Sequence, residues 1–457
     1  MVPQYIPGVP VETNSVSVTG NQRTQQGFFA KELSEVTETK TIDAMHSALQ
    51  RAVDRLKGYG IFDAVHAEIA VNDTDLAHNK YRVDVRVQVK EKRVATLKLE
   101  SYVKAGSTAV GDVGIEAQGA LRNPFGFGET ARVSVNRTNV GSEEFGLVVS
   151  APFPSPLLRD VTASARHSQD NLSAFTGYVQ QQSTLSVSSV VNNLDLQRVF
   201  GIPSGPAQHK VQYTFSLRDE VPVAHETVSR TSSVPEAILL QASSSSKSSL
   251  KYTYTRDTRN KGANSTAGEL LELELEAALP PGSSRFAKSD LKVELHRCLG
   301  PRLFGEDGLA VSLSGTLGIL QPIGAVAQLS DRFYMGGPMS LRGFGMLGCG
   351  PRAGEGRSSF PVGGNTKASL MVSLHCPVPL RAMAESGCRS FVFLNCGSIG
   401  RGASSGSVFG FPRLSVGLGG SFALGPARLE CTYSLPLLRA EQDQLKQVQI
   451  GAGLTLV

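Results

Sequence analysis

Apolar and polar side chains alternate along most of this chain. Between Thr96 and Val457 the alternation recurs in many segments, for example from Val211 to Arg218 and from Arg428 to Leu435. Because successive side chains of a β-strand point to opposite faces, each segment predicts a strand with one apolar and one polar face. We count about sixteen such segments, each about ten residues long.

Strand length and connection length separate two fold classes. A tilted strand of about ten residues crosses the hydrocarbon core of a bilayer, whereas strands of soluble proteins usually have about five or six residues. Short turns at 152–157 and 423–427 contrast with long polar loops at 220–246, 321–367 and 398–411. This contrast is typical of strands that cross a membrane. The sequence therefore favours a transmembrane β-barrel over the alternative, a large soluble all-β protein.

Composition narrows the choice further. No stretch reaches the roughly 18 consecutive apolar residues that a membrane-spanning helix requires. The mean hydropathy of -0.08 is also too low for a helical membrane bundle. The net charge of +5 is scattered along the chain, which is ordinary for a solvated surface, and we expect no nucleic-acid partner. We therefore predict a barrel of about 16 antiparallel strands over residues 95–457.

Residues 35–94 carry a different pattern. Apolar residues at spacings of three and four predict a helix from Thr41 to Gly58, with its first residue as N-cap and its glycine as the end. Strands are predicted from Ile61 to Ile69 and, with strict alternation, from Tyr81 to Lys90. We therefore predict a small α+β domain over residues 35–94, in which the helix packs on a two- or three-stranded sheet.

The first 34 residues show neither pattern. They contain no apolar segment after basic residues and no Arg-rich amphipathic helix. We expect residues 1–34 to form a flexible N-terminal segment. A chain that begins with Met1 and lacks a secretory signal is expected to be made in the cytosol of a cell with organelles.

No residue pattern predicts catalysis or metal binding. The six cysteines all lie in the second half without a C-x-x-C pair, and the eight histidines form no cluster. A G-x-G-x-x-G match at 343–348 does not lie between a strand and a helix, and a G-x-S-x-G match at 402–406 lies in a loop. We therefore predict a protein that is not an enzyme, with no catalytic residue, no cofactor and no metal.

Two short segments are candidates for a functional site. The first is Leu341-Arg342-Gly343-Phe344, in the long loop between the predicted eleventh and twelfth strands. The second is Phe393-Leu394-Asn395-Cys396-Gly397, in the predicted thirteenth strand. Alternation places Phe391, Phe393 and Asn395 on one face, and apolar rings that point into a polar lumen need an inserted loop to cover them. The alternative is a pair of unrelated phenylalanines on a lipid-facing strand.

The first segment resembles the [V/I/L]-R-G-F element in the sixth large loop of the outer-membrane β-barrel assembly and translocation superfamily. In that family the loop folds back into the barrel, where its arginine meets an F-x-[D/N]-x-G segment on strand thirteen. Phe393, Asn395 and Gly397 match that segment. Bacterial members commonly have aspartate at the position of Asn395, so this chain is more similar to the mitochondrial sorting and assembly machinery branch. The resemblance implies that Arg342 meets a neutral carbonyl without a full ion pair.

Residues 56–65 resemble the helix-to-strand turn of a polypeptide-transport-associated (POTRA) domain, L-x-x-x-G-x-F-x-x-V. The resemblance implies one POTRA-like domain at 35–94 that faces the intermembrane space, and a barrel in the mitochondrial outer membrane. The implied function is the insertion and folding of β-barrel precursor proteins. The implied partners are unfolded precursors with their β-signal strand, accessory outer-membrane assembly subunits and the lipid bilayer.

The implied mechanism is edge-strand templating at a lateral gate between the first strand, 96–105, and the last strand, 447–457. The expected gate residues are Tyr102, Val103, Gly451, Gly453 and Leu454. The two glycines weaken strand pairing and leave no side chain to lock the register, which predicts a loose seam. Crosslinking cysteines placed near Val103 and Leu454 is then expected to block insertion.

The segment Gln449-x-Gly451-x-x-Leu454-x-Leu456 resembles the C-terminal β-signal of mitochondrial barrel precursors. Clients with this signal are expected to pair with the first strand by β-augmentation. An ordinary closing strand is the alternative. Two other functions stay open: a polypeptide translocation pore of the plastid-envelope or two-partner-secretion type, and a plain diffusion channel. A channel has no use for the small domain or for the loop motif.

Overall fold

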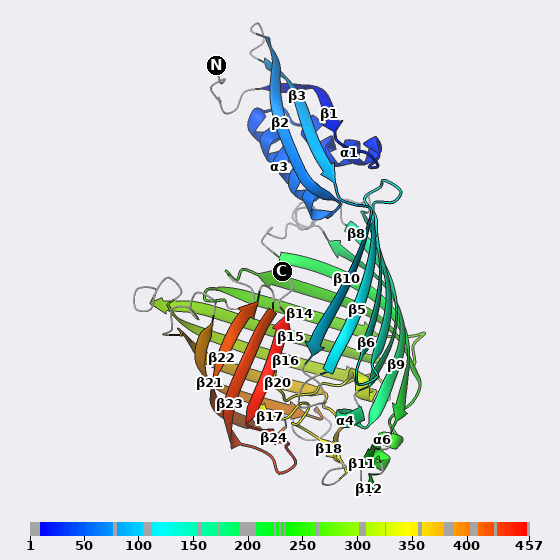
Figure 1. Ribbon diagram of the computed structural model, residues 1–457, viewed down its shortest axis with the longest axis vertical. Coiled ribbons are helices and arrows are strands. Elements are labelled where there is room, and N and C mark those ends of the chain that lie inside the picture. Colours follow the sequence, from blue (N-terminus) through cyan, green and yellow to red (C-terminus); the bar gives the residue numbers. More distant parts are fainter. Residues whose placement is uncertain are drawn as a thin grey trace.

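The computed structural model consists of a small N-terminal domain followed by a β-barrel (Figure 1). The structure describes residues 10–75, 80–104, 112–152, 158–171, 173–191, 207–223, 225–227, 230–232, 234–260, 265–300, 308–324, 326–354, 359–378, 388–402, 410–424 and 427–454.

Sixteen strands form one sheet, and neighbours in the sheet follow one another along the chain. Every ladder that joins these strands is antiparallel. The strands are β4 Ala95–Lys104, β5 Asp112–Arg122, β6 Thr130–Thr138, β7 Glu143–Pro152, β8 Leu158–Asn171, β9 Tyr178–Val191, β10 Ala207–Pro222, β13 Ser245–Asp257, β14 Gly268–Ala278, β15 Phe286–Gly300, β16 Leu309–Pro322, β20 Thr366–Pro377, β21 Arg389–Gly400, β22 Arg413–Leu424, β23 Ala427–Leu438 and β25 Val448–Leu454.

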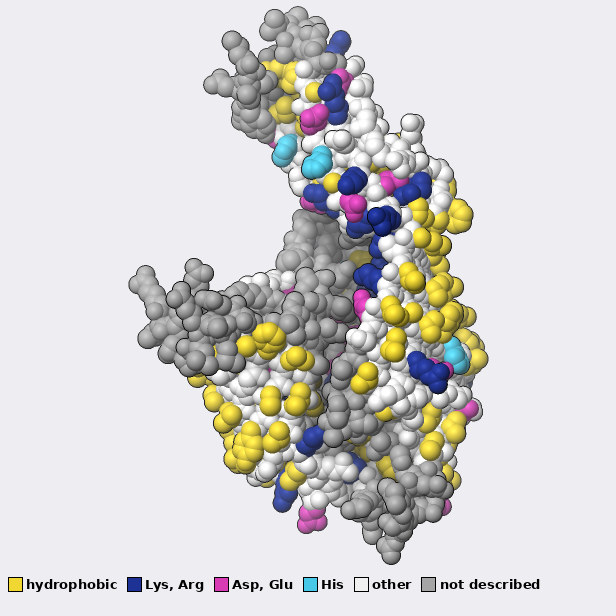
Figure 2. Space-filling model, viewed as in Figure 1, with side chains coloured by type: hydrophobic (Ala, Val, Ile, Leu, Met, Phe, Trp, Pro, Cys, Tyr) yellow, Lys and Arg dark blue, Asp and Glu magenta, His cyan; other side chains and the backbone are white. Residues whose placement is uncertain are grey.

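The two faces of the barrel wall differ as the alternation predicts. On β23, Leu429 and Tyr433 are 41% and 43% exposed, whereas Glu430, Thr432 and Ser434 are at most 3% exposed. Apolar side chains cover much of the visible outer surface of the barrel (Figure 2). An apolar exterior around a polar interior is what a strand-built membrane protein requires, and it confirms the predicted transmembrane β-barrel.

The connections at the barrel end away from the small domain carry short extra elements (Figure 1). These are α4 Ser173–Thr176, β11 His225–Thr227, β12 Arg230–Ser232 and α6 Glu236–Leu239. The long loops predicted at 220–246, 321–367 and 398–411 all belong to this end. The predicted contrast in loop length is not strict, because β6 and β7 are joined there by residues 139–142 alone.

The small domain packs helices on a three-stranded sheet of order β1-β3-β2. Its elements are β1 Val11–Thr19, α1 Gln26–Glu32, α2 Ser34–Thr37, α3 Ile42–Gly58, β2 Phe62–Asp75 and β3 Lys80–Glu91. The Thr41 side chain caps α3 by accepting from the Ala44 N–H, as its sequence predicts. Alternation along β3 buries Val83, Val85 and Val87 in the core that α3 covers. No helix among the described residues is long and apolar enough to cross a membrane.

The prediction that residues 1–34 form a flexible segment is wrong for the described part, which begins at Pro10. Strand β1 pairs in parallel with β3, and Phe29 of α1 is 1% exposed in the core of the small domain. The hydrogen-bonding partner of β1 lies far away in the sequence, so local patterning gives no sign of the pairing. Residues 1–9 lie outside the described residues. The sheet and core of the domain therefore include residues that the predicted boundary at residue 35 left out.

Glu91, at the end of β3, connects the N-terminal segment to the barrel. Its carboxylate is 4% exposed and accepts from the backbone N–H groups of Gln22, Arg23 and Thr24 and from Thr24 Oγ1 at 2.6 Å. Thr24 Oγ1 in turn accepts from Asn123 Nδ2 at 2.7 Å. Because Asn123 follows β5, this chain of hydrogen bonds holds the small domain against the first strands of the barrel.

These contacts predict a pH-dependent attachment of the N-terminal segment. Burial alone would raise the pKa of Glu91, but hydrogen bonds from Thr24 and from the neighbouring backbone N–H groups hold it below its ordinary value of 4.5. The stabilisation is therefore complete above that value and is lost as the pH falls through the lower folded-state pKa. At pH 7, Glu91→Gln should raise hydrogen exchange at the Thr24 amide about 5- to 150-fold, which corresponds to roughly 1–3 kcal/mol.

The ratio of exchange rates in the variant and the unmodified protein cancels the intrinsic effect of pH on exchange. This ratio should fall toward one in acid, once Glu91 is protonated in the folded protein. A ratio that stays the same from neutral pH to acid would contradict the role assigned to the carboxylate.

Candidate functional site

Loop six, defined here as residues 323–365 between β16 and β20, folds back into the barrel. Its elements are η1 Leu329–Asp331, β17 Gly343–Phe344, β18 Arg352–Ala353 and β19 Phe360–Pro361. Leu341 and Phe344 are 0% exposed and Arg342 is 4% exposed. The two apolar side chains join Ile399 of β21 in one buried cluster. The Leu341–Phe344 segment thus belongs to the connection between the eleventh and twelfth strands of the sheet. It folds against part of the inner wall of the barrel, as the resemblance implies.

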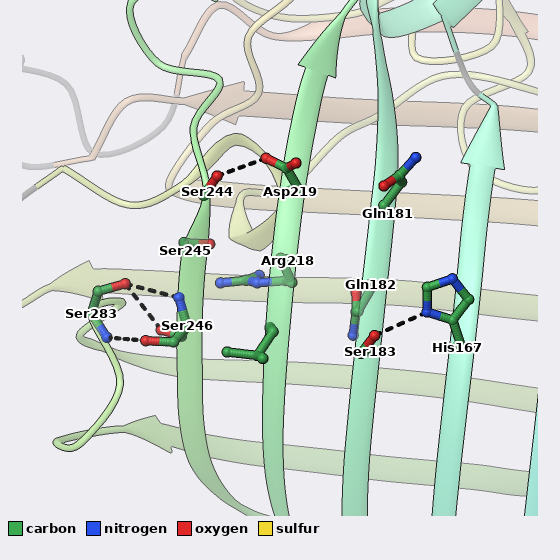
Figure 3. Close-up of a pocket in the computed structure, with 11 residues that line it drawn as sticks. His167, Gln181, Gln182, Ser183, Arg218, Asp219, Ser244, Ser245, Ser246 and Ser283 are labelled. Carbon is green, nitrogen blue, oxygen red and sulfur yellow. Dashed lines mark hydrogen bonds between the residues drawn. The ribbon is translucent and has the colours of Figure 1, made fainter.

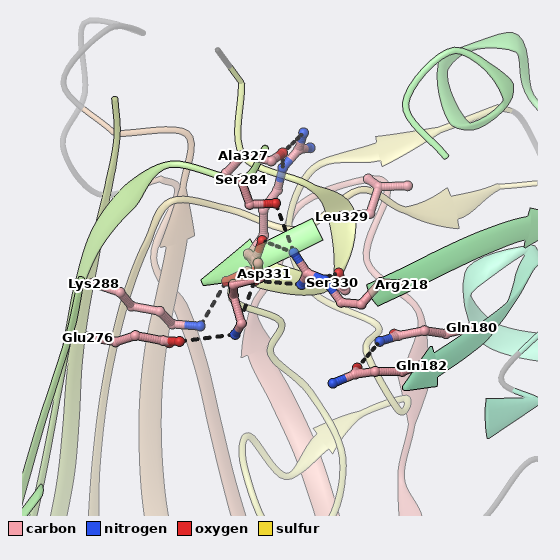
Figure 4. A network of polar contacts seen from close by, with 12 residues as sticks. Gln180, Gln182, Arg218, Glu276, Ser284, Lys288, Ala327, Leu329, Ser330 and Asp331 are labelled. Carbon is pink, nitrogen blue, oxygen red and sulfur yellow. Dashed lines mark hydrogen bonds and ion pairs between the residues drawn. The ribbon is translucent and has the colours of Figure 1, made fainter. Parts of the chain in front are cut away.

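A polar network ties the beginning of loop six to strands in the middle of the sheet (Figure 4). The Asp331 carboxylate accepts from both terminal nitrogens of Arg218, at 2.8 and 3.0 Å, and its backbone oxygen accepts from Lys288 Nζ at 2.7 Å. Lys247 Nζ lies 3.7 Å from Asp331 and 3.0 Å from Glu276. Because these partners lie on β10, β13, β14 and β15, the loop is held at one end by strands far from the last strand.

The Arg342 guanidinium forms an ion pair with Glu430 of β23 inside the barrel. Nη2 and Oε2 are 2.5 Å apart, and the side chains are 5% and 2% exposed. The guanidinium carbon lies 5.2 Å from the ring centre of Phe393 and 5.7 Å from that of Phe391. The prediction that Arg342 meets the neutral carbonyl of Asn395 without a full ion pair is therefore wrong. The reason is that β23 places the Glu430 carboxylate in the lumen. A negatively charged carboxylate stabilises a buried cation better than a neutral amide does.

Asn395 binds the backbone of the motif instead. With its amide oriented to match its neighbours, Oδ1 accepts from the Arg342 N–H at 2.8 Å and Nδ2 donates to Ser415 Oγ. Ser415 Oγ then donates to the Arg342 carbonyl at 2.6 Å. These groups form a closed ring of hydrogen bonds. An ionised aspartate could not donate to Ser415, so the neutral residue suits this ring.

Two glycines allow loop six to approach the wall. A methyl group at Gly397 would lie 2.9 Å from Leu341 Cδ1 and 2.8 Å from Met335 Sδ. Gly343 has a φ of +90°, which residues with a side chain rarely adopt, and a Cβ there would lie 3.2 Å from Ser434 Cβ. A methyl group at Gly397 would therefore push the ends of the Met335 and Leu341 side chains aside, and a side chain at Gly343 would strain the backbone of the loop.

The last strand also holds the motif, through Gln449. Its Nε2 donates to the Phe344 carbonyl at 2.7 Å, and its Oε1 accepts from the Gly343 N–H at 2.9 Å. Just before β25, the short strand β24 (Leu445–Lys446) pairs with β17 in antiparallel fashion. The motif therefore contacts β21, β22, β23 and β25, four consecutive strands at one edge of the sheet.

Strands β4 and β25 are the two edges of the sixteen-stranded sheet. The expected gate residues lie on these edges: Tyr102 and Val103 on β4, and Gly451, Gly453 and Leu454 on β25. Within the described ranges, β4 pairs with β5 and β25 pairs with β23, and no ladder joins β4 to β25. Ala105 of the expected first strand and residues 455–457 of the expected last strand lie outside the described residues.

Strand direction corrects the expected crosslink. In an antiparallel sheet of sixteen strands, the first and last strands run in opposite directions. Val103 lies near the end of β4, whereas Leu454 is the last residue of β25, so the two lie at opposite ends of the seam. Residues nearer the middle suit a crosslink better. Leu99 and Ile450, which are 74% and 73% exposed, are such a pair.

A second polar region lies across β8, β9, β10 and β13 (Figure 3). His167 and Ser183 share a hydrogen bond of 2.9 Å, and Ser244 donates to Asp219 at 2.8 Å. These side chains thus bond to one another and do not converge on a common point. In the part of the chain that the structure describes, no three His, Cys, Asp or Glu residues are grouped to hold a metal ion.

Sequence reasoning missed Glu430, Gln449 and Arg218 as structural partners of loop six. Alternation does place Glu430 on the polar face of its strand, opposite Leu429, and therefore in the lumen. It does not show which lumen group meets an inserted loop, because that depends on how deeply the loop enters the barrel. For Gln449, the sequence shows the resemblance to a β-signal but gives no sign of the contact with loop six.

Comparison with known proteins shows similarity along nearly the whole chain. The Omp85 superfamily domain matches residues 123–456. A SAM50-like protein of Schizosaccharomyces pombe is 28% identical over 98% of this chain and 91% of its own length. The sorting and assembly machinery component 50 homolog of Homo sapiens is 27% identical over 97% of this chain and 90% of that protein. The crystal structure of BamA from Haemophilus ducreyi lacking POTRA domains 1–3 has a TM-score of 0.73 at 16% identity, over 97% of this chain and 85% of that one, which indicates a shared fold.

Proposed function

Because this chain belongs to the Omp85 superfamily, we propose that it inserts and folds β-barrel precursor proteins in the mitochondrial outer membrane. Relatives named for the sorting and assembly machinery match 97–98% of the chain at 27–28% identity, which supports this function. The fold that it shares with BamA supports the β-barrel architecture that this function requires. No covalent step is required, because strand pairing and burial in lipid supply the driving force.

The proposed function would pair the backbone N–H and C=O groups at the edge of a precursor strand. In hydrocarbon, each unsatisfied N–H or C=O group costs several kcal/mol, so a precursor strand cannot enter the bilayer with a free edge. Strand β4 would offer its own free edge, and a precursor would extend the sheet by β-augmentation. The observation that carries the proposal is the pair of edges: β4 and β25 end the sheet without a ladder between them in the described residues, beside strands that loop six holds from inside.

The proposal includes location and partners. The small domain, which resembles a POTRA domain, would face the intermembrane space, on the side where β25 ends. Unfolded precursors with a β-signal strand would be the clients, and the lipid bilayer would surround the barrel. The relatives' names refer to a machinery, which supports the presence of accessory assembly subunits.

The similarity does not favour a translocation pore. The relatives that match nearly the whole chain carry names that refer to sorting and assembly. A plain diffusion channel would leave the contacts of the Leu341–Phe344 motif without a purpose.

Depletion tests the proposed function. When the protein is depleted from cells, newly imported porin in isolated mitochondria should fail to reach its folded, protease-resistant form, in proportion to the protein lost. Import of a helical matrix precursor serves as the control and should continue at its normal rate. Normal porin assembly at full depletion, accompanied only by a loss of membrane conductance, would favour a diffusion channel instead.

A further inference from the structure

Loop six contacts the last strand at two positions that are two residues apart, and we propose that it acts as a register pin for β25. The two positions are Gln449 and Gly451, which both face the lumen and are buried. Each contact admits one kind of residue. The inference concerns how the last strand is positioned and holds whatever clients the protein serves.

The first contact selects a carboxamide. Gln449 donates to the Phe344 carbonyl and accepts from the Gly343 N–H, so one side chain satisfies a donor and an acceptor of the loop backbone. Leucine or alanine would leave both backbone groups buried without a partner, and glutamate could not donate. Gln449 is 2% exposed, so solvent does not reach these two backbone groups to replace its hydrogen bonds.

The second contact selects glycine. A methyl group at Gly451 would lie 2.9 Å from Pro338 Cβ and 3.2 Å from Met339 Sδ. The 2.9 Å separation is shorter than real carbon contacts, so a side chain at position 451 would force the Pro338 segment of loop six to shift. Together, the two contacts match a strand that has glutamine and, two residues later, glycine on its inner face.

Besides its ladder with β23, β25 is positioned by loop six, at these two contacts and through the β17–β24 ladder just before it. It is seven residues long and, among the described residues, pairs only with β23. A slip by two residues would keep each side chain on its own face, but it would move Gln449 by roughly 7 Å and break both contacts. The expectation that the glycines leave nothing to lock the register therefore overlooked the side chain of Gln449.

A native cysteine makes the register measurable. Cys431 of β23 is the partner of Ile450 in the ladder, and both side chains are exposed on the outer face. We would place a single cysteine at position 448, 450 or 452 of the full-length protein in membranes. A mild oxidant would then form disulfides, and peptide mapping would identify which cysteines are bridged. Direct bridging requires Cα atoms within about 7 Å, so it reports the residue that lies opposite Cys431.

In the otherwise unmodified protein, Ile450→Cys should bridge to Cys431, and Val448→Cys and Ala452→Cys should form little of this bridge. With Gln449→Ala added, the 431–450 bridge should fall at least about threefold, and bridges to 448 or 452 should rise. Gly451→Ala should have the same effect by pushing loop six away. Gln447→Ala is the matched control, because Gln447 is exposed and is expected to leave the pattern unchanged.

Resistance of the barrel to added protease shows in each case that the chain has folded. If Gln449→Ala does not fold, Gln449→Asn, which shortens the same carboxamide, takes its place. An unchanged bridging pattern in both the position-449 and position-451 variants would overturn the proposal. Slippage in the Gln447→Ala control as large as in the Gln449 variant would also overturn it, because register would then not depend on loop six.

Discussion

Replacing Arg342 with alanine should reduce the assembly of β-barrel precursors at least about tenfold while leaving most of the protein itself in the membrane. The substitution removes a guanidinium that is 5% exposed and paired with a carboxylate that is 2% exposed. Breaking a buried ion pair costs about 3–5 kcal/mol, mostly because one charge is left without a partner. Here Arg428 Nη2 still lies 2.6 Å from Glu430, so the carboxylate keeps one cation. The cost should therefore fall on the docking of loop six, and the barrel wall should persist.

The measurement is the rate at which newly imported porin becomes protease-resistant in isolated mitochondria that contain each variant at equal abundance. Arg342→Lys should recover only part of the activity, because an ammonium group lacks the planar fork of a guanidinium. Arg439→Ala removes an exposed arginine just after β23 and is the control. Assembly at the unmodified rate in Arg342→Ala would contradict the role given to the motif.

The sequence allowed the barrel to be predicted because a period of two, sustained for about ten residues per segment, has few other physical meanings. The α3 helix was equally predictable, since its apolar spacing, its Thr41 cap and its final glycine all agree. Strand β1 was not predictable in the same way. Its pairing with β3 depends on a parallel contact across the whole small domain, which leaves no local period in the sequence.

The candidate site was predictable in its parts but not in its pairing. The Leu341–Phe344 motif, and the placement of Phe393 and Asn395 on one face of their strand, indicated that a loop lies against strand thirteen. The ion pair of Arg342 with Glu430 depends on where the loop rests against β23, and no rule of alternation gives that depth. For the same reason, the sequence indicates that Gln449 resembles part of a β-signal but does not indicate its contact with the loop.

Closing the seam covalently should stop insertion altogether. If β4 must present a free edge to a client, a bridge from β4 to β25 removes that edge, and the client would have to enter lipid with unpaired backbone groups at several kcal/mol each. Leu99→Cys with Ile450→Cys places both thiols on exposed positions of the two edges. Cys431 must be changed to serine in this variant, because it lies directly opposite residue 450 and would compete for the crosslink.

The most direct test of edge-strand templating follows from that variant. Isolated mitochondria that carry it would be treated with a reducible thiol crosslinker, and newly imported porin would be followed into its folded form before and after reduction. We predict that assembly falls at least about tenfold in the crosslinked protein and returns after reduction, whereas each single-cysteine variant stays active under the same treatment. Full porin assembly while the bridge between β4 and β25 is intact would contradict the account.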